Sequence, residues 1–343
     1  MKTLLNTLYV QTQGAYLRLE LDTLKVEVED QTKVQIPLHH LGALVFFGNV
    51  MVSPAVLSRC AQDGRSVTWL SRSGRFQGRL EGPVSGNVLL RRAQHEALSD
   101  PLRPLELARH FVAGKLINMR HSVLRSARET DKPGEQEVMT NTSRRLARII
   151  KQLPETKDLE KIRGLEGEGS RTYFETFSLM VRTDRQTFQF KGRNRRPPLD
   201  PINALLSFLY ALLLSDCAAA AQGVGLDPQV GFLHALRPGR PALALDLMEE
   251  LRPVLADRLA LTLINLRQVT AKDFDERPGG AVLLNKAGRK KVVVAYQERK
   301  QKEIFHQVLE QKMPLGLVPH IQARLLARHL GGDLPGYPPF LYR

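Results

Sequence analysis

The sequence contains few cysteines and no long apolar run. Its 343 residues include two cysteines, Cys60 and Cys217, which lie far apart and form no CxxC pair. This excludes a disulfide scaffold and a zinc knuckle, and it is typical of a reducing compartment. The longest apolar stretch, 204–214, is shorter than the roughly 20 residues that cross a membrane, and no signal-peptide pattern opens the chain. We therefore expect a cytoplasmic protein without a membrane partner, in which 204–214 forms a buried helix.

Several nucleotide-binding and catalytic motifs are also missing. The sequence has no Walker loop, no GxGxxG after a predicted strand, no HExxH and no GxSxG. These absences remove the usual signatures of nucleotide-driven enzymes, dinucleotide-dependent enzymes, zinc proteases and α/β-hydrolases.

Positive charge is abundant. Fifty Lys and Arg residues face 35 Asp and Glu residues, which gives a net charge of +15, while 43% of the residues are apolar. The apolar content is enough for a buried core. A basic soluble chain most often binds nucleic acid, and an anionic membrane surface is the second alternative. The charge could also serve solubility alone.

The hydrophobic pattern changes along the chain and predicts an α+β protein with two domains, 1–86 and 87–343. Between residues 17 and 36, apolar residues alternate with polar ones, which predicts half-buried strands. The turns between them are too short for crossover helices, so we expect antiparallel pairing. Two apolar runs, 43–47 and 67–70, predict buried strands. This β-rich domain is expected to be a scaffold or a dimer surface.

The second domain has mainly helical periodicity. A helical face begins at residue 88, and a long helix is predicted over about 104–128, followed by a polar loop over 129–140. Further helices are predicted over 142–152, 165–182, 202–222, 242–262, 298–309 and 317–330. One exception is 282–295, which we interpret as a hairpin whose loop carries Lys286, Arg289, Lys290 and Lys291.

Two carboxylates stand among glycines at 163–170. Glu166 and Glu168 alternate with Gly164, Gly167 and Gly169 near the predicted start of a helix. Acids at this place often only stabilise the helix dipole. Their glycine-rich setting nevertheless makes them candidates for chemistry.

A histidine and a group of acids form the second candidate. His234 follows Gly-Phe-Leu, and the segment DLMEELRP at 246–253 places Asp246, Glu249 and Glu250 three and four residues apart, on one helix face. A histidine beside apolar residues is more often a core residue than a ligand. Asp246 lies between apolar residues, so it needs a cation, whether Arg252, another basic side chain or a metal.

Carboxylates with one imidazole favour Mg²⁺ or Mn²⁺ over structural zinc, which prefers thiolates. In a basic protein, such an ion makes a phosphodiester the natural substrate, because it can activate the attacking oxygen and stabilise the leaving one.

Two basic segments could contact DNA. The first contains Lys191, Arg193, Arg195 and Arg196 and is followed by prolines that hold it extended. The second is 286–291. Such runs are usually solvated loops, and a nearby metal site would favour DNA contact.

Four ordered motifs together carry a family resemblance: LEG at 165–167, RRPPLDPINALLS at 195–207, GFLH at 231–234 and DLMEELRP at 246–253. They resemble the CRISPR-associated spacer-acquisition integrase/endonuclease, the first of the two universal adaptation proteins of CRISPR systems. The order of motifs matches over essentially the whole chain. RNRRPP at 193–198 and LLARH at 325–329 are most similar to the type I-C branch.

The resemblance implies a function, a set of partners and a ligand set. It implies a β-rich domain that helps to form a homodimer. Two such homodimers are expected to flank a dimer of the small ferredoxin-like second adaptation protein, which gives a 4:2 complex. It implies that prespacer double-stranded DNA is joined to a CRISPR repeat by direct transesterification from its 3′-hydroxyls, with hydrolysis when water replaces them. Its implied catalytic and metal residues are Glu166, His234, Asp246 and Glu249.

Some alternatives stay open. Glu168 competes with Glu166, and Glu250 competes with Glu249. A metal-dependent nuclease of DNA repair or branched-DNA resolution would need the same residues. A non-catalytic DNA-binding scaffold would use the acids only in salt bridges.

Overall fold

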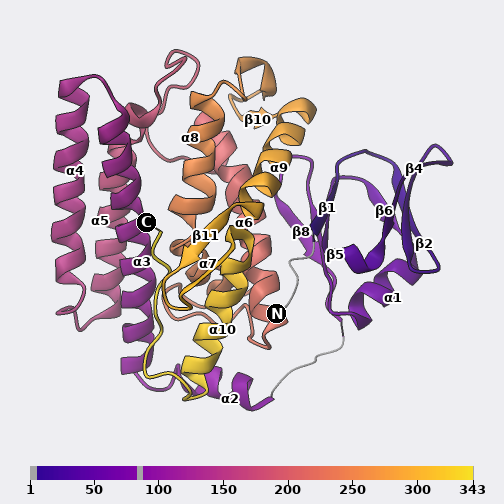
Figure 1. Cartoon of the computed structure of the whole chain (residues 1–343), viewed down its shortest axis with the longest axis horizontal. Helices are drawn as coiled ribbons and strands as arrows, with labels where there is room; N and C mark the ends of the chain where they lie inside the picture. The colour runs from indigo at the N-terminus through magenta and orange to yellow at the C-terminus, as the bar shows by residue number, and fades with distance from the viewer. Residues whose placement is uncertain (1–5, 83–87, 343) are drawn as a thin grey trace. The chain divides into compact units, whose positions relative to one another are not determined.

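The computed structural model of the chain describes residues 6–82 and 88–342 (Figure 1). The chain divides into two compact units, Met1–Gly86 and Asn87–Arg343, and each is described by itself.

The first unit contains two four-stranded sheets. One has the order β1-β5-β7-β8 and the other the order β4-β3-β2-β6. The elements are β1 (Asn6–Val10), β2 (Ala15–Glu20), β3 (Thr23–Val28), β4 (Gln31–Pro37), β5 (Leu41–Phe47), β6 (Val50–Val52), α1 (Pro54–Gln62), β7 (Ser66–Leu70) and β8 (Phe76–Arg79). Their inward-facing Leu, Val and Phe side chains form one core cluster.

The β-rich character of this unit is confirmed, but the expectation of purely antiparallel pairing is wrong. Strands β2, β3 and β4 do form an antiparallel meander, whereas β1 pairs parallel with β5, β5 with β7 and β2 with β6. The helix α1 was not predicted. Ser53 caps it by accepting a hydrogen bond from the Val56 amide, and Pro54 takes its first position. This helix carries the chain across the sheet, so β7 can run parallel to β5.

The second unit is mainly helical, as predicted. Its helices are α2 (Val88–Glu96), α3 (Leu102–Glu129), α4 (Pro133–Gln152), α5 (Leu159–Thr176), α6 (Pro201–Gly223), α7 (Ala242–Glu249), a π-helix (Arg252–Asp257), α8 (Arg258–Asn265), α9 (Lys286–Gln301) and α10 (Val318–Leu330). Two small hairpins pair β9 (Phe274–Glu276) with β10 (Val282–Leu284) and β11 (Glu303–His306) with β12 (Gln311–Pro314).

Helix α6 is the core helix expected from the apolar stretch at 204–214. Asp200 caps its start by accepting a hydrogen bond of 2.7 Å from the Asn203 amide, and buried Leu, Ile, Ala and Phe side chains follow along its length. Its length and composition would also suit a membrane span, and 56% of its most apolar window is buried. No other helix in the part of the chain that the structure describes has this property.

Helices α3, α4 and α5 pack against one another (Figure 1). The predicted loop over 129–140 is wrong, because α4 already begins at Pro133. Proline is favoured at the first position of a helix, and Glu135 in the first turn complements the helix dipole. Both oxygens of Glu135 also accept hydrogen bonds from Arg185, at 2.6 and 2.7 Å.

The predicted hairpin over 282–295 and helix over 298–309 are also wrong. The hairpin turns earlier, between β9 and β10, and the Asn285 side chain then caps α9. Three successive valines at 292–294 favour a strand by propensity, but Val292 and Val293 are buried as parts of α9. The segment 303–314 is the hairpin β11–β12.

Candidate active site

Glu166 lies in the middle of α5, so the three glycines around it are helical. Gly169 has a clear reason to be glycine, because a Cβ atom there would lie 2.3 Å from Leu116 Cδ2 on α3. The close approach of the two helices brings Lys115, the neighbour of Leu116, against Glu166.

Asp246 is completely buried on α7 and holds the segment that carries His234. Its carboxylate accepts backbone hydrogen bonds from Phe232 (2.6 Å), Leu233 (3.0 Å) and His234 (3.0 Å). It also contacts His234 Nδ1 at 2.7 Å. The buried charge is therefore satisfied by four N–H groups of the chain itself when Nδ1 carries the proton.

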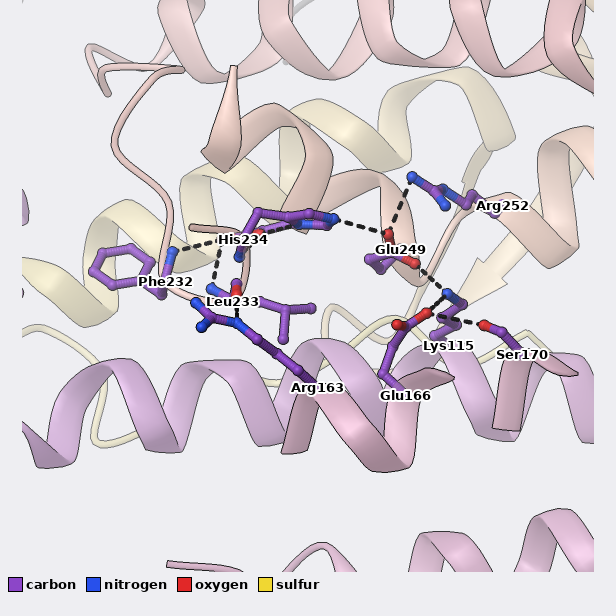
Figure 2. Close-up of polar contacts among 10 residues, drawn as sticks. Lys115, Arg163, Glu166, Ser170, Phe232, Leu233, His234, Glu249 and Arg252 are labelled. Atoms are coloured by element: carbon purple, nitrogen blue, oxygen red, sulfur yellow. Dashed lines mark hydrogen bonds and ion pairs between the residues drawn. The ribbon is translucent and has the colours of Figure 1, made fainter. Parts of the chain in front are cut away.

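Gly231 allows residues 232–234 to approach Asp246 and α7 closely. A Cβ atom there would lie 2.6 Å from the backbone carbonyl carbon of Ala242 and 2.7 Å from Asp246 Oδ2. On the other side, Arg163 of α5 donates a hydrogen bond of 2.7 Å to the Leu233 carbonyl (Figure 2). The segment is thus held from two helices, and the orientation of the imidazole is fixed.

His234 Nε2 then faces Glu249 Oε1 at 3.6 Å (Figure 2). Glu249 also contacts Arg252 Nη2 at 3.1 Å and Lys115 Nζ at 2.6 Å. Burial alone would raise the pKa of this carboxyl group, but the charges of Arg252, Lys115 and His234 lower it to about 2. Glu249 is therefore an anion at neutral pH.

Lys115 joins the two halves of the site. Its ammonium contacts Glu166 Oε1 as well as Glu249 Oε2, and the same Glu166 oxygen accepts a hydrogen bond of 2.9 Å from the Ser170 hydroxyl. The Lys115 ammonium thus lies between the two carboxylates, and His234 faces the other oxygen of Glu249 (Figure 2).

The competing acids lie elsewhere. Glu168 is exposed on α5. Glu250 faces away from the site and accepts hydrogen bonds from the Tyr337 hydroxyl (2.5 Å), Gln322 Nε2 (3.0 Å) and the Phe340 amide (2.7 Å). Burial raises the pKa of Glu250 to about 7 in spite of these donors. Of the competing acids, Glu249 rather than Glu250 faces His234, and Glu166 rather than Glu168 contacts Lys115.

A segment far along the chain closes over this region. Asn118 of α3 donates hydrogen bonds of 2.8 Å to the carbonyls of Glu250 and Phe340, and it accepts one of 2.8 Å from the Tyr342 amide. Together with the bonds to Glu250, these contacts hold residues 337–342 against α3 and the end of α7. We call residues 337–342 the C-terminal strap.

A cavity of about 680 Å³ opens beside Glu166 and Lys115. Its wall includes three predicted DNA-binding residues: Lys191, Arg193 and Arg195. The wall also includes Arg252, which the sequence offered as a partner of Asp246, and four residues that the sequence did not point to, namely Arg171, Phe174, Phe190 and Tyr210. Lys191 and Arg195 are exposed, as is Arg196 next to them.

Arg193 has internal partners. Its guanidinium donates hydrogen bonds to Asn203 Oδ1 (2.6 Å) and Ser207 Oγ (3.1 Å) on α6, and it lies over the ring of Tyr210. It therefore anchors the basic segment to the core, and its contact with DNA stays a prediction.

The second basic segment does not line the cavity. Arg289 donates to the Leu284 carbonyl at 2.7 Å, Lys291 contacts Asp273 at 2.8 Å, and Lys290 is exposed on α9. Their contact with DNA also stays a prediction.

Glu166, His234 and Glu249 are the candidate ligands for a divalent ion. Two carboxylates and an imidazole suit Mg²⁺ or Mn²⁺ chemically, and the position between Glu166 and Glu249 already accepts a cation, the Lys115 ammonium. Among residues 6–82 and 88–342, no three His, Cys, Asp or Glu side chains form a group that could hold a metal. The donor types of Glu166, His234 and Glu249 thus fit such an ion, and the position between the two carboxylates is taken by Lys115.

The sequence did not single out Lys115. A lysine among the apolar positions of the long helix α3 would have been a signal, since a buried lysine requires an anionic partner. Its acidic partners lie far along the chain, so no spacing rule could have named them.

Comparisons with known proteins agree in family and fold. Residues 8–298 match the family described as "CRISPR associated protein Cas1". A CRISPR-associated endonuclease Cas1 of Moorella thermoacetica is 57% identical over 343 residues, which covers 100% of both chains.

Two solved structures share the fold. A casposase bound to an integration product superposes with a TM-score of 0.83 at 22% identity, covering 99% of this chain and 95% of the casposase chain. A Cas6-RT-Cas1–Cas2 complex gives a TM-score of 0.83 at 23% identity, covering 99% of this chain and 36% of the other. The family match and the sequence identity lead to one conclusion: the chain belongs to the CRISPR-associated Cas1 family.

Proposed function

We propose that this protein is a metal-dependent DNA endonuclease and integrase of CRISPR adaptation, which joins prespacer 3′-hydroxyls to a CRISPR repeat by transesterification. The observation that carries the proposal is the contact of Glu166 and Glu249 with one cation, the Lys115 ammonium, beside a basic cavity, with His234 facing the other oxygen of Glu249. A strand-joining reaction conserves the phosphodiester bond and needs no nucleotide energy, which agrees with the missing Walker loop.

The site residues have different proposed roles. Glu166 and Glu249 would hold Mg²⁺ or Mn²⁺, with His234 Nε2 as the neutral donor. When bound, such an ion activates the attacking oxygen and stabilises the leaving oxygen of a phosphodiester. Asp246 holds the imidazole through Nδ1, which leaves Nε2 directed at Glu249. Arg252 keeps Glu249 ionised from the opposite side.

The cavity gives the DNA a place beside these residues. Lys191 and Arg195 can bind backbone phosphates, and the half-buried rings of Phe174 and Phe190, with centroids 5.8 Å apart, offer a face to a base. A phosphodiester bound in this cavity would lie next to Glu166.

Two structures of similar fold support the proposed partners. A casposase has been solved with an integration product, and a Cas1 within a Cas1–Cas2 assembly. For this chain we propose prespacer and repeat DNA as substrates, a homodimer, and a 4:2 complex with the second adaptation protein. Such substrates imply a cytoplasmic location, and the type I-C branch stays a prediction from the motifs.

The first experiment measures Mn²⁺- or Mg²⁺-dependent nicking and strand transfer by the purified protein. Glu166→Gln, His234→Ala and Glu249→Gln should each abolish both reactions while leaving DNA affinity and the circular dichroism spectrum unchanged. Asp333→Asn, a charge change on the exposed surface, is the matched control. Absence of both reactions in the wild-type protein would support the non-catalytic scaffold, and full activity of the three site variants would place the catalytic site elsewhere.

The second experiment separates an integrase from a nuclease. A supercoiled plasmid that bears a repeat is incubated with labelled prespacer DNA, with and without the second adaptation protein. Covalent transfer of label to the plasmid is expected. Plasmid cleavage without any joined product would contradict the integrase proposal and favour a repair or branched-DNA nuclease.

A further inference from the structure

Lys115 has an unusual position for a lysine. Its side chain is only 3% exposed, and its ammonium contacts Glu166 and Glu249 at the point where the two acids approach each other. A buried lysine is stable only when anions compensate its charge. Here the compensating anions are the same two acids that the proposed function needs for its ion.

The charges of the site already balance. Glu166 and Glu249 are matched by Lys115 and Arg252, while the buried Asp246 is satisfied by N–H groups. A divalent ion between Glu166 and Glu249 would add two positive charges directly beside the ammonium. The two cations cannot share this place, because they would compete for the same oxygens and repel each other.

The Lys115 side chain has space beside it into which it can move. Its side chain lines the cavity of about 680 Å³, and its four-carbon stem is flexible. Arg252 has a fixed place instead, since its guanidinium packs over the Tyr210 ring and contacts Glu249. Of the two cations on Glu249, Lys115 is the one that can leave.

We propose that Lys115 is an exchangeable counter-cation of the catalytic acids: its ammonium occupies the metal position in the metal-free protein, and on metal binding it withdraws into the cavity, where it contacts a DNA phosphate. This inference rests on the proposed function. It assigns to Lys115 two alternating anionic partners, the carboxylates without metal and the phosphodiester with it.

The experiment follows the reactivity of the Lys115 amine in the wild-type protein. Full-length protein is treated briefly with a small water-soluble acetylating reagent, and modified lysines are quantified by peptide mass spectrometry. With EDTA, Lys115 should be protected. With Mn²⁺ its modification should rise about tenfold or more, because the amine enters an open cavity. A short DNA oligonucleotide added with Mn²⁺ should protect it again.

Lys161 is the internal control, since it is exposed on the same helix as Glu166 and lies outside the cavity wall. Its modification should be equal in all three conditions. Continued protection of Lys115 at saturating Mn²⁺ would overturn the exchange, and equal modification with and without DNA would overturn the phosphate contact.

A second measurement uses Lys115→Met, which keeps the length of the stem and removes the charge. Mn²⁺ affinity, measured by calorimetry, should increase about tenfold or more, because the ion no longer has to displace a cation. Strand transfer at saturating Mn²⁺ should nevertheless decrease. A purely structural lysine would give the opposite result, weaker Mn²⁺ binding, and this would overturn the proposal. Lys161→Met should bind Mn²⁺ like the wild type.

The same calorimetry separates this inference from the proposed function. If Glu249→Gln binds Mn²⁺ as tightly as the wild type, the metal site itself is wrong. If Glu249→Gln loses Mn²⁺ binding while Lys115→Met leaves it unchanged, only the exchange is wrong.

Discussion

The carboxylate oxygens of Asp246 are occupied by hydrogen bonds within the protein. Both oxygens accept hydrogen bonds from backbone N–H groups at 232–234, and His234 Nδ1 contacts one of them. The sequence predicted a cation as the partner of Asp246, whereas the partners in the structure are three backbone amides and His234. It did not reveal that backbone amides would be this partner, because they come from a turn whose shape depends on Gly231 fitting against α7.

Asp246→Asn should therefore be strongly destabilising. The amide group of asparagine replaces an acceptor by a donor, which would face backbone N–H groups in a site without water access. We expect the free energy of unfolding to decrease by about 2–4 kcal/mol, measured in urea. Asp333→Asn, with a side chain 66% exposed, should change it by less than about 0.5 kcal/mol. Equal effects of the two variants would contradict the described role of Asp246.

Asp257 predicts a pH dependence of stability. It is completely buried at the end of the π-helix, and its Oδ1 accepts a hydrogen bond of 2.6 Å from the Tyr210 hydroxyl. Burial raises its pKa from 3.8 to about 6, although Tyr210 and the charges of Arg252 and Arg193 oppose the shift. Because the folded state keeps this proton at a higher pH than the unfolded state, stability is highest below pH 4 for this group. It decreases as the pH rises from about 4 to 6.

The measurement compares urea midpoints at pH 4 and pH 7. Asp257→Asn should be free of this contribution, which amounts to at most about 3 kcal/mol. The stability difference between variant and wild type should therefore shift in favour of the variant as the pH rises. An identical pH dependence of the two proteins would show that Asp257 does not titrate in this range.

At the scale of elements, the periodicity of apolar residues predicted most helices of the second unit. It failed where a local signal outweighed the pattern: Pro133 starts α4 inside a polar segment, and Asn285 caps α9 in front of three valines. These caps are visible in the sequence. The packing that buries Val292 and Val293 in a helix is not, because the neighbouring elements come from distant parts of the chain.

The glycines of α5 provide a matched test. Both Gly164 and Gly169 are helical, but a Cβ atom at Gly164 would have nothing within 4 Å, whereas one at Gly169 would strike Leu116. Gly164→Ala should stabilise the protein by about 0.5–1 kcal/mol through helix propensity. Gly169→Ala should destabilise it by about 1–2 kcal/mol, because the buried Leu116 must move. Calorimetric unfolding measures both, and equal changes would contradict the close packing of α3 on α5.

At the scale of the whole molecule, the net charge of +15 fits a polyanion partner but does not locate it. The structure places Lys191 and Arg195 on the cavity wall, with the exposed Arg196 beside Arg195. It also shows that Arg193 is bonded to α6, which no count of charges could reveal. Family motifs in the sequence named Glu166, His234, Asp246 and Glu249, and their role as metal ligands stays a prediction.

Salt dependence tests this DNA path. Arg195→Gln with Arg196→Gln should weaken duplex binding, and each lost phosphate contact should reduce the slope of log affinity against log salt by about 0.9. The control is Arg92→Gln with Arg103→Gln, which removes the same charge from exposed positions on α2 and α3 outside the cavity wall. Binding is measured by fluorescence anisotropy. An unchanged slope in the first variant would place the DNA elsewhere.

The C-terminal strap has a consequence for how the active protein arises during translation. Residues 337–342 supply hydrogen-bond partners for Glu250 and Asn118, which leave the ribosome much earlier. Until the strap has been synthesised, the buried Glu250 carboxylate lacks its Tyr337 and Phe340 donors, and the helix end that carries Glu249 lacks its support. The surroundings of Glu249 are therefore completed only after residues 337–342 have been synthesised.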